Sequence, residues 1–455
     1  MKQTARYEMD MVNGPILSKV LMFSVPLMLT SVLQLLFNAA DIVVVGRYAG
    51  STALAAVGST GALINLIVNV LMGMSIGTSV LVARYYGANR PQDVSETVHT
   101  SIAISFFGGI LFSIGGILIC RPMLELMSTP PEVIDQAALY MRIYFAGLPV
   151  IAVYNFGSAV LRAVGDTRRP LYFLTIAGVV NVILNLICVI GLKMGVAGVA
   201  LPTVLSQTVA AALVIWCLLR SDSSIRLQIK KVRVYGGKMR EIVKIGLPAG
   251  IQGSVFSISN VVIQSSVNSF GSTVMAANSA AGNLEGFVYV IMNAFYQAAL
   301  TFTSQNLGAG KPERIRRILF NCVGMVTLFG LAMGLSVYFA GGTLLTIYST
   351  DPEVIRWGLI RLSYVCAPYF ICGIMDTMVG MMRGLGYSVT PMIVSMVGVV
   401  GVRLGWIYTI FAANHTLQSL YVSYPVSWAL TAAVHMGCFI YAYRKIMKGR
   451  RLEAA

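Results

Sequence analysis

The chain has 455 residues, of which 57% are hydrophobic and only 11% are charged. Soluble domains carry about 25% charged residues, so this composition excludes an ordinary soluble protein and predicts a polytopic membrane protein. The net charge of +16 would suggest a nucleic-acid partner in a soluble protein, but the positions of the basic residues explain it without one.

Twelve apolar segments are long enough to cross about 30 Å of hydrocarbon as helices. They span residues 16–45, 54–83, 97–119, 136–161, 170–191, 195–219, 241–268, 274–303, 318–340, 355–382, 391–411 and 417–443. Backbone groups in lipid must be paired within the protein, and segments of this length exclude a barrel of short strands. The predicted fold class is an all-α integral membrane protein with twelve transmembrane helices.

Basic residues alternate between the predicted loops. Of the 33 Lys and Arg residues, 26 fall in the N-terminal segment, in every second loop and in the C-terminal tail. Six others, among them Arg361, belong to the intervening loops and their flanks, and Arg403 lies within a span. Because loops rich in Lys and Arg stay in the cytoplasm, we expect a multi-pass protein of the cell membrane with both termini cytoplasmic.

An internal repeat recurs at an offset of 221 residues. Ser128–Ile134 matches Ser349–Ile355 at six of seven positions, and Gly50–Ala56 matches Gly271–Ala277 at five of seven. The repeat predicts two six-helix lobes, 1–219 and 241–455, joined by a basic cytoplasmic linker at 220–240. Since six is even, the lobes have the same orientation, so we expect a pseudo-twofold axis along the membrane normal. A transport site near their interface and alternating access are the expected use of such a duplication.

The first span carries a polar stripe of Gln34, Asn38 and Asp41, which share one helix face at i, i+4 and i+7. A carboxylate inside a span costs roughly 3 kcal/mol on insertion scales and marks an ion or substrate path by default. The alternative is that Asp41 lies at the membrane interface.

Asn181, Asn185 and Thr203 lie at a similar predicted depth to Asp41. With a rise of 1.5 Å per residue, all four side chains start roughly 7–15 Å below the outer ends of their spans. One carboxylate, two amides and a hydroxyl can form a cation site of oxygen ligands, or hold a protonatable carboxylate by hydrogen bonds. The alternative for the two asparagines is a purely structural bond between helices.

The second half has Ile263 where an acid equivalent to Asp41 would stand. Its intramembrane candidates are instead Glu285, Asp376 and Arg403. Pairing of Arg403 with Asp376 or Glu285 would make the burial of these charges tolerable. Such a pair would serve either substrate contact or the stability of the lobe.

Several stretches together resemble the multidrug and toxic compound extrusion (MATE) family, and its DinF-like branch in particular. They are Asp41-Ile-Val-Val-Val-Gly46, Asn181-Val-Ile-Leu-Asn185, Leu161-Arg-Ala-Val-Gly-Asp166, Met382-Arg-Gly-Leu-Gly386 and Gln305-Asn-Leu-Gly-Ala309. The resemblance covers the whole chain and implies a twelve-helix, two-lobed antiporter that expels organic compounds in exchange for H⁺ or Na⁺. Asn185 replaces an aspartate that is common in the family, which favours H⁺ over Na⁺.

The expected function is therefore export of organic cations or amphipathic drugs by a cation-coupled antiporter. The alternative is a flippase for a lipid-linked saccharide or another amphiphile. No enzymatic constellation is apparent, and the seven cysteines follow no disulfide or metal-site pattern. We expect no enzyme activity, no metal site and no cofactor besides the coupling ion. The expected partners are a small organic substrate and membrane lipid, not nucleic acid, and the expected state is a monomer.

Overall fold

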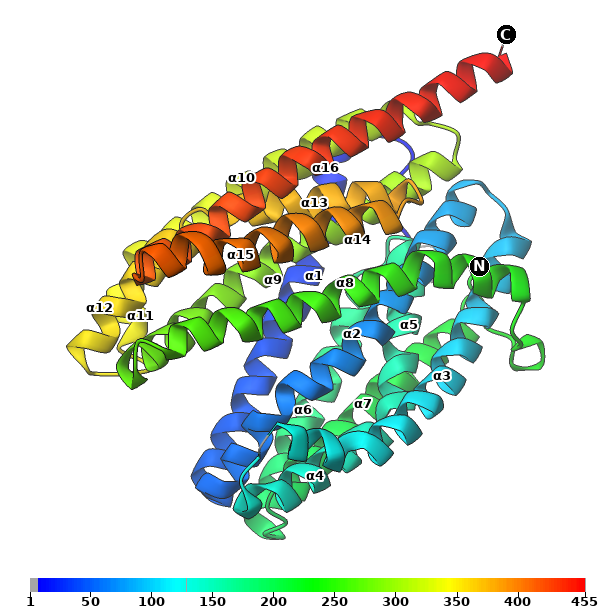
Figure 1. Cartoon of the computed structure of the whole chain (residues 1–455). Helices are drawn as coiled ribbons and strands as arrows, with labels where there is room; N and C mark the ends of the chain where they lie inside the picture. The colour runs from blue at the N-terminus through cyan, green and yellow to red at the C-terminus, as the bar shows by residue number, and fades with distance from the viewer. Residues whose placement is uncertain (1–6, 128, 455) are drawn as a thin grey trace. The chain divides into compact units, whose positions relative to one another are not determined.

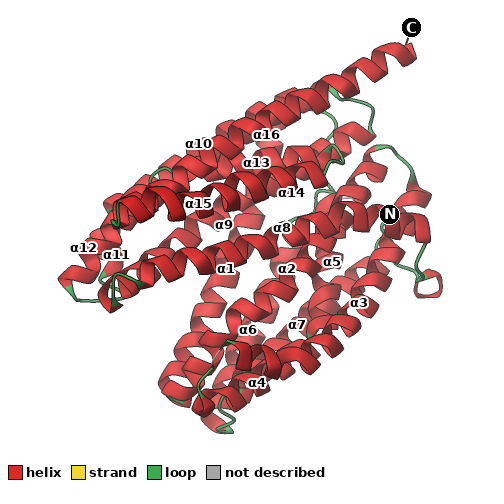
Figure 2. Ribbon diagram, viewed as in Figure 1, coloured by secondary structure: helices red, strands yellow, loops and turns green. Residues whose placement is uncertain are grey.

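The computed structural model describes residues 7–127 and 129–454, and every regular element in them is a helix (Figure 1; Figure 2). The first elements are α1 (Ile16–Val44), η1 (Val45–Ala49), α2 (Ser51–Gly87), α3 (Pro91–Leu126), α4 (Pro131–Ala146), α5 (Leu148–Ala163), α6 (Arg168–Asn185), η2 (Leu186–Gly191), α7 (Ala197–Leu219) and η3 (Ile229–Lys231). The remaining elements are α8 (Gly236–Asn268), α9 (Ser272–Gly308), α10 (Glu313–Phe339), α11 (Gly341–Leu345), α12 (Pro352–Arg361), η4 (Leu362–Cys366), α13 (Tyr369–Gly384), α14 (Val389–Ser395), η5 (Met396–Gly401), α15 (Val402–Trp406), η6 (Ile407–Phe411) and α16 (Leu417–Ala454). Of the short η elements, η3 is a 3₁₀ turn and the others are π-helical.

Within the described residues, nine helices are long and apolar enough to cross a membrane, or eleven if two bent helix pairs each count as one span. The helix α9 also has sufficient length, at 37 residues, but polar side chains such as Glu285, Asn293 and Gln297 lower its hydropathy. All twelve predicted spans thus fall on helical segments.

Two predicted spans are sharply bent. The axis turns by 47° between α4 and α5, and by 40° between the end of η4 and α13. Pro149 and Pro368 lie at these breaks. Proline lacks an amide hydrogen and clashes with the preceding turn, so a bend at each position has a local cause.

The chain forms two compact units. Unit 1 comprises Met1–Asp10 and Leu29–Ser254, and unit 2 comprises Met11–Met28 and Val255–Ala455. The first part of α1 therefore belongs to the unit that holds the later helices, and the first part of α8 belongs to unit 1. The compact units divide the chain inside α1 and α8, whereas the boundaries predicted at residues 219 and 241 separate the two repeated halves of the sequence. Those predicted boundaries therefore stay a prediction.

Close glycine packing joins α8 to α2 within unit 1. A Cβ atom added to Gly73 would lie 2.2 Å from the backbone nitrogen of Gly250, and one added to Gly77 would lie 2.4 Å from the carbonyl oxygen of Ile242. A Cβ on Gly246 would in turn lie 2.6 Å from Cα of Met74. The two backbones touch here only because both helices present glycine at the crossing.

The helices α2, α4, α5, α6 and α7 surround the interior of unit 1, where α5 and α7 pack on each other and α6 packs on α7. Buried apolar side chains such as Leu71, Met141 and Phe145 fill part of the space between α2 and α4. The part of α1 from Leu29 onward closes one side, and a polar cavity remains among these helices.

Candidate functional site

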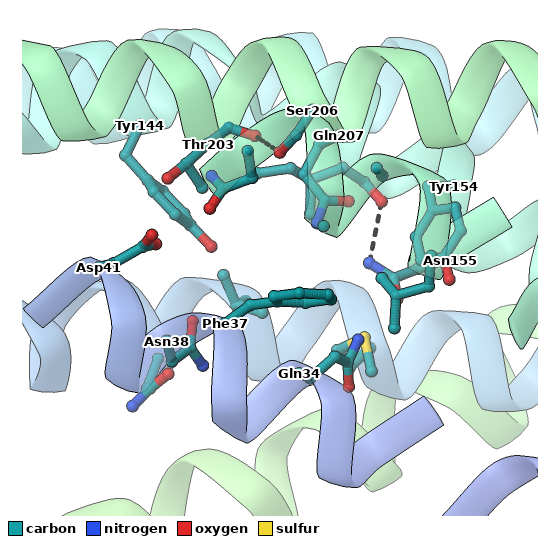
Figure 3. A pocket seen from close by; sticks show the side chains of 18 of the residues that line it. Gln34, Phe37, Asn38, Asp41, Tyr144, Tyr154, Asn155, Thr203, Ser206 and Gln207 are labelled. Carbon is teal, nitrogen blue, oxygen red and sulfur yellow. Dashed lines mark hydrogen bonds between the residues drawn. The ribbon is translucent and has the colours of Figure 1, made fainter. Parts of the chain in front are cut away.

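The cavity in unit 1 has a volume of about 390 Å³ (Figure 3). Its wall comes from α1, α2, α4, α5, α6 and α7. The lining residues are Gln34, Phe37, Asn38, Asp41, Asn65, Val68, Met72, Tyr140, Tyr144, Ile151, Tyr154, Asn155, Leu174, Ala177, Gly178, Asn181, Thr203, Ser206 and Gln207. Asp41 is the one charged side chain in this set.

Asp41 is connected through Asn185 to the second asparagine of α6, Asn181. The side-chain amide of Asn185 donates a hydrogen bond to the Asp41 carboxylate and a second one, of 3.1 Å, to Oδ1 of Asn181. Both asparagines are buried, because the α6 face that carries them turns inward. Oδ1 of Asn185 is buried without a hydrogen-bond partner among the described residues. The three side chains predicted from their depth thus form one connected polar group.

Thr203 lines the same cavity from α7, as its predicted depth implied. Its hydroxyl donates to the carbonyl oxygen of Val199 at 2.9 Å, so its hydrogen is engaged within its own helix. The Ser206 hydroxyl donates in the same way to the Thr203 carbonyl oxygen at 2.9 Å (Figure 3). The oxygen lone pairs of both hydroxyls remain for a bound group.

Gln34 and Asn38 line the cavity from α1, two turns and one turn, respectively, before the end of the polar stripe at Asp41 (Figure 3). The stripe predicted from helical spacing is therefore continuous along one wall. The functional role of Asp41 stays a prediction.

Aromatic and amide side chains that the sequence analysis did not single out complete the wall. They include Tyr140 and Tyr144 of α4, whose rings stack with centroids 6.5 Å apart, and Tyr154, Asn155 and Gln207. Tyr and Asn are also common in the packed interior of a helical bundle, so residue type alone gave no signal.

Phe37 projects from α1 into the cavity (Figure 3). Its ring rests against Gly178 of α6, and a Cβ atom added there would lie 1.8 Å from a ring carbon. This contact lies one helical turn before Asp41 on α1 and two turns before Asn185 on α6. The same two helices therefore meet at a steric contact and at a hydrogen bond.

The predicted pairing of Arg403 with Glu285 or Asp376 is wrong. Glu285 instead pairs with Arg361, whose Nε and Nη2 donate to the two carboxylate oxygens at 2.8 Å each. Arg361 also donates to Oδ1 of Asn278 at 2.5 Å. Both charged side chains are buried. The sequence pattern indicates a loop or its flank for Arg361, because this residue stands near the start of an apolar segment.

Arg403 is buried against aromatic rings instead. Its guanidinium carbon lies 4.3 Å from the Tyr424 ring centroid and 5.6 Å from that of Trp428. Its Nε donates to the Ser427 hydroxyl at 3.0 Å. Asp376, on α13, is half-buried and lies within electrostatic range of Tyr289. The three candidate residues of the second half therefore lie in different surroundings. Glu285 is in an ion pair with Arg361, Arg403 packs against aromatic rings, and Asp376 is a half-buried carboxylate.

Comparison with known proteins gives a consistent result. The family model MatE matches the chain twice, over residues 26–187 and 248–409, which confirms the internal duplication. A probable multidrug resistance protein of Bacillus subtilis, YoeA, is 27% identical over 436 residues and covers 93% of each chain. The probable multidrug resistance protein NorM of Thermotoga maritima is 25% identical over 397 residues, which are 85% of this chain and 84% of that protein.

A protein called FAD transporter in Shewanella oneidensis is also similar, with 25% identity over 354 residues, covering 76% of this chain and 77% of that protein. Among solved structures, an outward-facing multidrug resistance MATE transporter superposes with a TM-score of 0.89 at 20% identity, covering 99% of both chains. A MATE crystal structure in complex with MaL6 gives a TM-score of 0.89 at 20% identity, covering 97% of this chain and 98% of that one. These likenesses confirm the predicted twelve-helix, two-lobed fold class.

Proposed function

Since the chain belongs to the MatE family of multidrug efflux transporters, we propose that it is a membrane antiporter that exports small organic cations or amphipathic drugs. The exchanged ion in this proposal is H⁺ rather than Na⁺, and Asp41 carries it.

The observation that supports this substrate class is the composition of the cavity wall. One carboxylate stands among tyrosine and phenylalanine rings and six amides, and no lining residue is basic. Aromatic faces and a carboxylate attract a cation with an apolar body, and the amides supply adjustable hydrogen bonds. An anionic substrate would find no positive charge among the lining residues and would be repelled by Asp41.

The coupling mechanism follows from the position of Asp41 in the same cavity. A proton and a cationic substrate compete for one carboxylate, so each one displaces the other. When Asp41 is ionised, the hydrogen bond that the side-chain amide of Asn185 donates stabilises the charge. When Asp41 is protonated, rotation of that amide presents Oδ1 of Asn185, which can accept the new O–H. Asn185 serves both states, and α1 is free to repack once the half-buried charge is gone.

The ligand set supports H⁺ over Na⁺. A sodium ion needs several oxygen ligands at once, but the Asn185 nitrogen already donates to one oxygen of Asp41 and to Oδ1 of Asn181. A proton needs only the carboxylate and one acceptor. Asn185 and Asn181 thus act as positioning residues for Asp41 in this proposal, and Thr203 supplies a hydroxyl to the same cavity wall.

The test is efflux of a fluorescent organic cation from energised cells by the wild type and by Asp41→Asn. The amide keeps the shape of the side chain but binds no proton, so coupled export is expected to fall to the background level. An uncoupler is expected to stop export by the wild type, and removal of Na⁺ is expected to leave it unchanged.

The matched control is Asp135→Asn, because Asp135 is an exposed carboxylate of α4 that pairs with Arg121 outside the cavity. It should export like the wild type. Unimpaired export by Asp41→Asn would contradict the role of Asp41, and a requirement for Na⁺ would reverse the choice of ion. If the wild type exports no cationic dye but moves a lipid-linked saccharide or an anionic substrate, the alternative of a flippase or an anion transporter replaces this proposal.

A further inference from the structure

The segment between α7 and α8 is folded onto the helices of unit 1. Ile225 and Leu227 are fully or almost fully buried. The backbone amide of Leu227 donates to the Leu218 carbonyl oxygen at 3.0 Å. Farther along, the amide of Tyr235 donates to the Thr100 hydroxyl of α3 at 3.2 Å. The segment therefore has a fixed inner side.

His99 of α3 holds the middle of this segment. Its Nε2 accepts the backbone amide of Gln228 at 2.9 Å, and its Nδ1 lies 2.6 Å from the Ser95 carbonyl oxygen. The ring is buried, so both nitrogens are engaged away from solvent. The turn η3, which follows Gln228, consequently has a fixed position on the surface.

Four cations point outward from this fixed scaffold: Arg226, Lys230, Lys231 and Arg233 are all exposed. No acidic residue occurs between Ser223 and Arg240. In the part of the chain that the structure describes, none of the four forms an ion pair, whereas the nearby Asp93 is already occupied by Lys238 and Arg90. The protein thus holds four like charges together without supplying their counter-charge.

An apolar side chain stands among these cations. Ile229 is 72% exposed, and Val234, farther along the segment, is 45% exposed. The segment joins Leu219 to Gly236, which end and begin two membrane-spanning helices, so it lies at the membrane surface. Cations that flank an exposed isoleucine at this level match a layer of anionic headgroups above acyl chains.

We propose that this face, Arg226 to Val234, binds the headgroups of anionic phospholipids in the surrounding bilayer. The four cations contact the phosphate and headgroup charge, and Ile229 inserts beside the acyl chains. Each Lys or Arg near an anionic surface contributes about fivefold to binding, so four together select anionic lipid strongly. This property is independent of the coupling ion and of the transported substrate.

The test uses the full chain with Ile229→Trp, reconstituted in phosphatidylcholine bilayers that contain an equal minor fraction of brominated phosphatidylglycerol or brominated phosphatidylcholine. Bromine quenches nearby tryptophan, and the signal of the four native tryptophans is subtracted with the unsubstituted protein. Quenching by the brominated phosphatidylglycerol is expected to be at least about twofold stronger.

Two variants decide the origin of the selectivity. Replacing Arg226, Lys230, Lys231 and Arg233 by Gln should abolish the difference between the lipids. Replacing the exposed Arg316, Arg317, Lys445 and Lys448 by Gln changes the net charge equally and should preserve it. Equal quenching by both lipids, no quenching by either, or selectivity that survives the linker substitutions overturns the proposal. So does an equal loss of selectivity in both variants.

Discussion

The buried pair of Arg361 and Glu285 places two opposite charges among apolar and aromatic neighbours. Arg361 satisfies both oxygens of Glu285 and one oxygen of Asn278, and its guanidinium carbon lies 5.5 Å from the Tyr421 ring centroid. A bidentate contact of this kind offsets much of the cost of burying the charges. Removing one partner alone leaves the other uncompensated.

We therefore expect Arg361→Met to lower the stability of the purified protein by about 3–5 kcal/mol. The double variant Arg361→Met with Glu285→Gln should recover much of this loss, because no unpaired charge remains. Thermal unfolding in detergent measures both. The control is Arg356→Met, which breaks the exposed pair with Glu353, 3.4 Å long, and should cost no more than about 1 kcal/mol. A double variant as unstable as the single one would contradict this account.

Individual site residues were predictable where polarity conflicted with a membrane span. Asp41, Asn181 and Asn185 stood out for that reason, and their similar depth predicted that they lie together. Arg361 was missed because a basic residue near the end of a span is normally an interfacial one. Tyr140 and Gln207 gave no signal, since the residue type fits a packed interior as well as a cavity.

Between elements, α1 is positioned against α6 by two side-chain contacts. Other helices of unit 1 pack extensively, such as α6 against α7, whereas α1 makes no comparable backbone contact among the described residues. The Phe37 ring on Gly178 and the Asp41–Asn185 hydrogen bond therefore join α1 to α6, beside the contact between η1 and η2 that continue these two helices. A ring displaced from Gly178 would draw Asp41 away from Asn185.

We expect Gly178→Ala to reduce export by at least about fivefold, because the new methyl group occupies the place of the ring. Phe37→Leu in the same protein should restore much of the activity, since it removes the ring carbons that clash. The dye-efflux assay compares the single and double variants. Gly108→Ala is the control, because no heavy atom lies within 4 Å of a Cβ at Gly108. A double variant no more active than Gly178→Ala would show that the two residues act separately.

The glycine contact between α2 and α8 gives a prediction about stability. Alanine normally stabilises a helix relative to glycine by up to about 1 kcal/mol, so Gly61→Ala, which meets no atom within 4 Å, should be neutral or stabilising. Gly73→Ala is expected to cost about 1–3 kcal/mol, because its Cβ would strike backbone rather than a movable side chain. Thermal unfolding distinguishes them, and an equal effect of the two substitutions would contradict close backbone packing.

For the whole molecule, the alternation of basic loops predicts an orientation that can be tested at two exposed positions. Ile347 follows α11 and is 75% exposed, and Ile229 lies in the linker. With both termini in the cytoplasm, a membrane-impermeant thiol reagent should label Ile347→Cys in intact cells and Ile229→Cys only in inverted vesicles. The seven native cysteines are buried or half-buried, so an unsubstituted protein gives the background. The opposite pattern would reverse the predicted topology.

At this scale, the number of spans, the duplication and the family were predictable because hydropathy and repeated motifs report them directly. The division of α1 and α8 between the compact units was not. Hydropathy identifies a span, but it does not identify the neighbours of each half of that span. The hydropathy of a segment is the same whichever unit it joins, and this holds for Met11–Met28 and for Gly236–Ser254.

This division has a consequence for biosynthesis. Each compact unit contains a helix segment that is encoded with the other half, so the two halves are related as in a domain-swapped dimer whose subunits have been fused. A ribosome that has finished residue 219 has not yet made Gly236–Ser254, which unit 1 requires. Separately produced fragments cut in the linker should therefore mature only when both are present in the same cell.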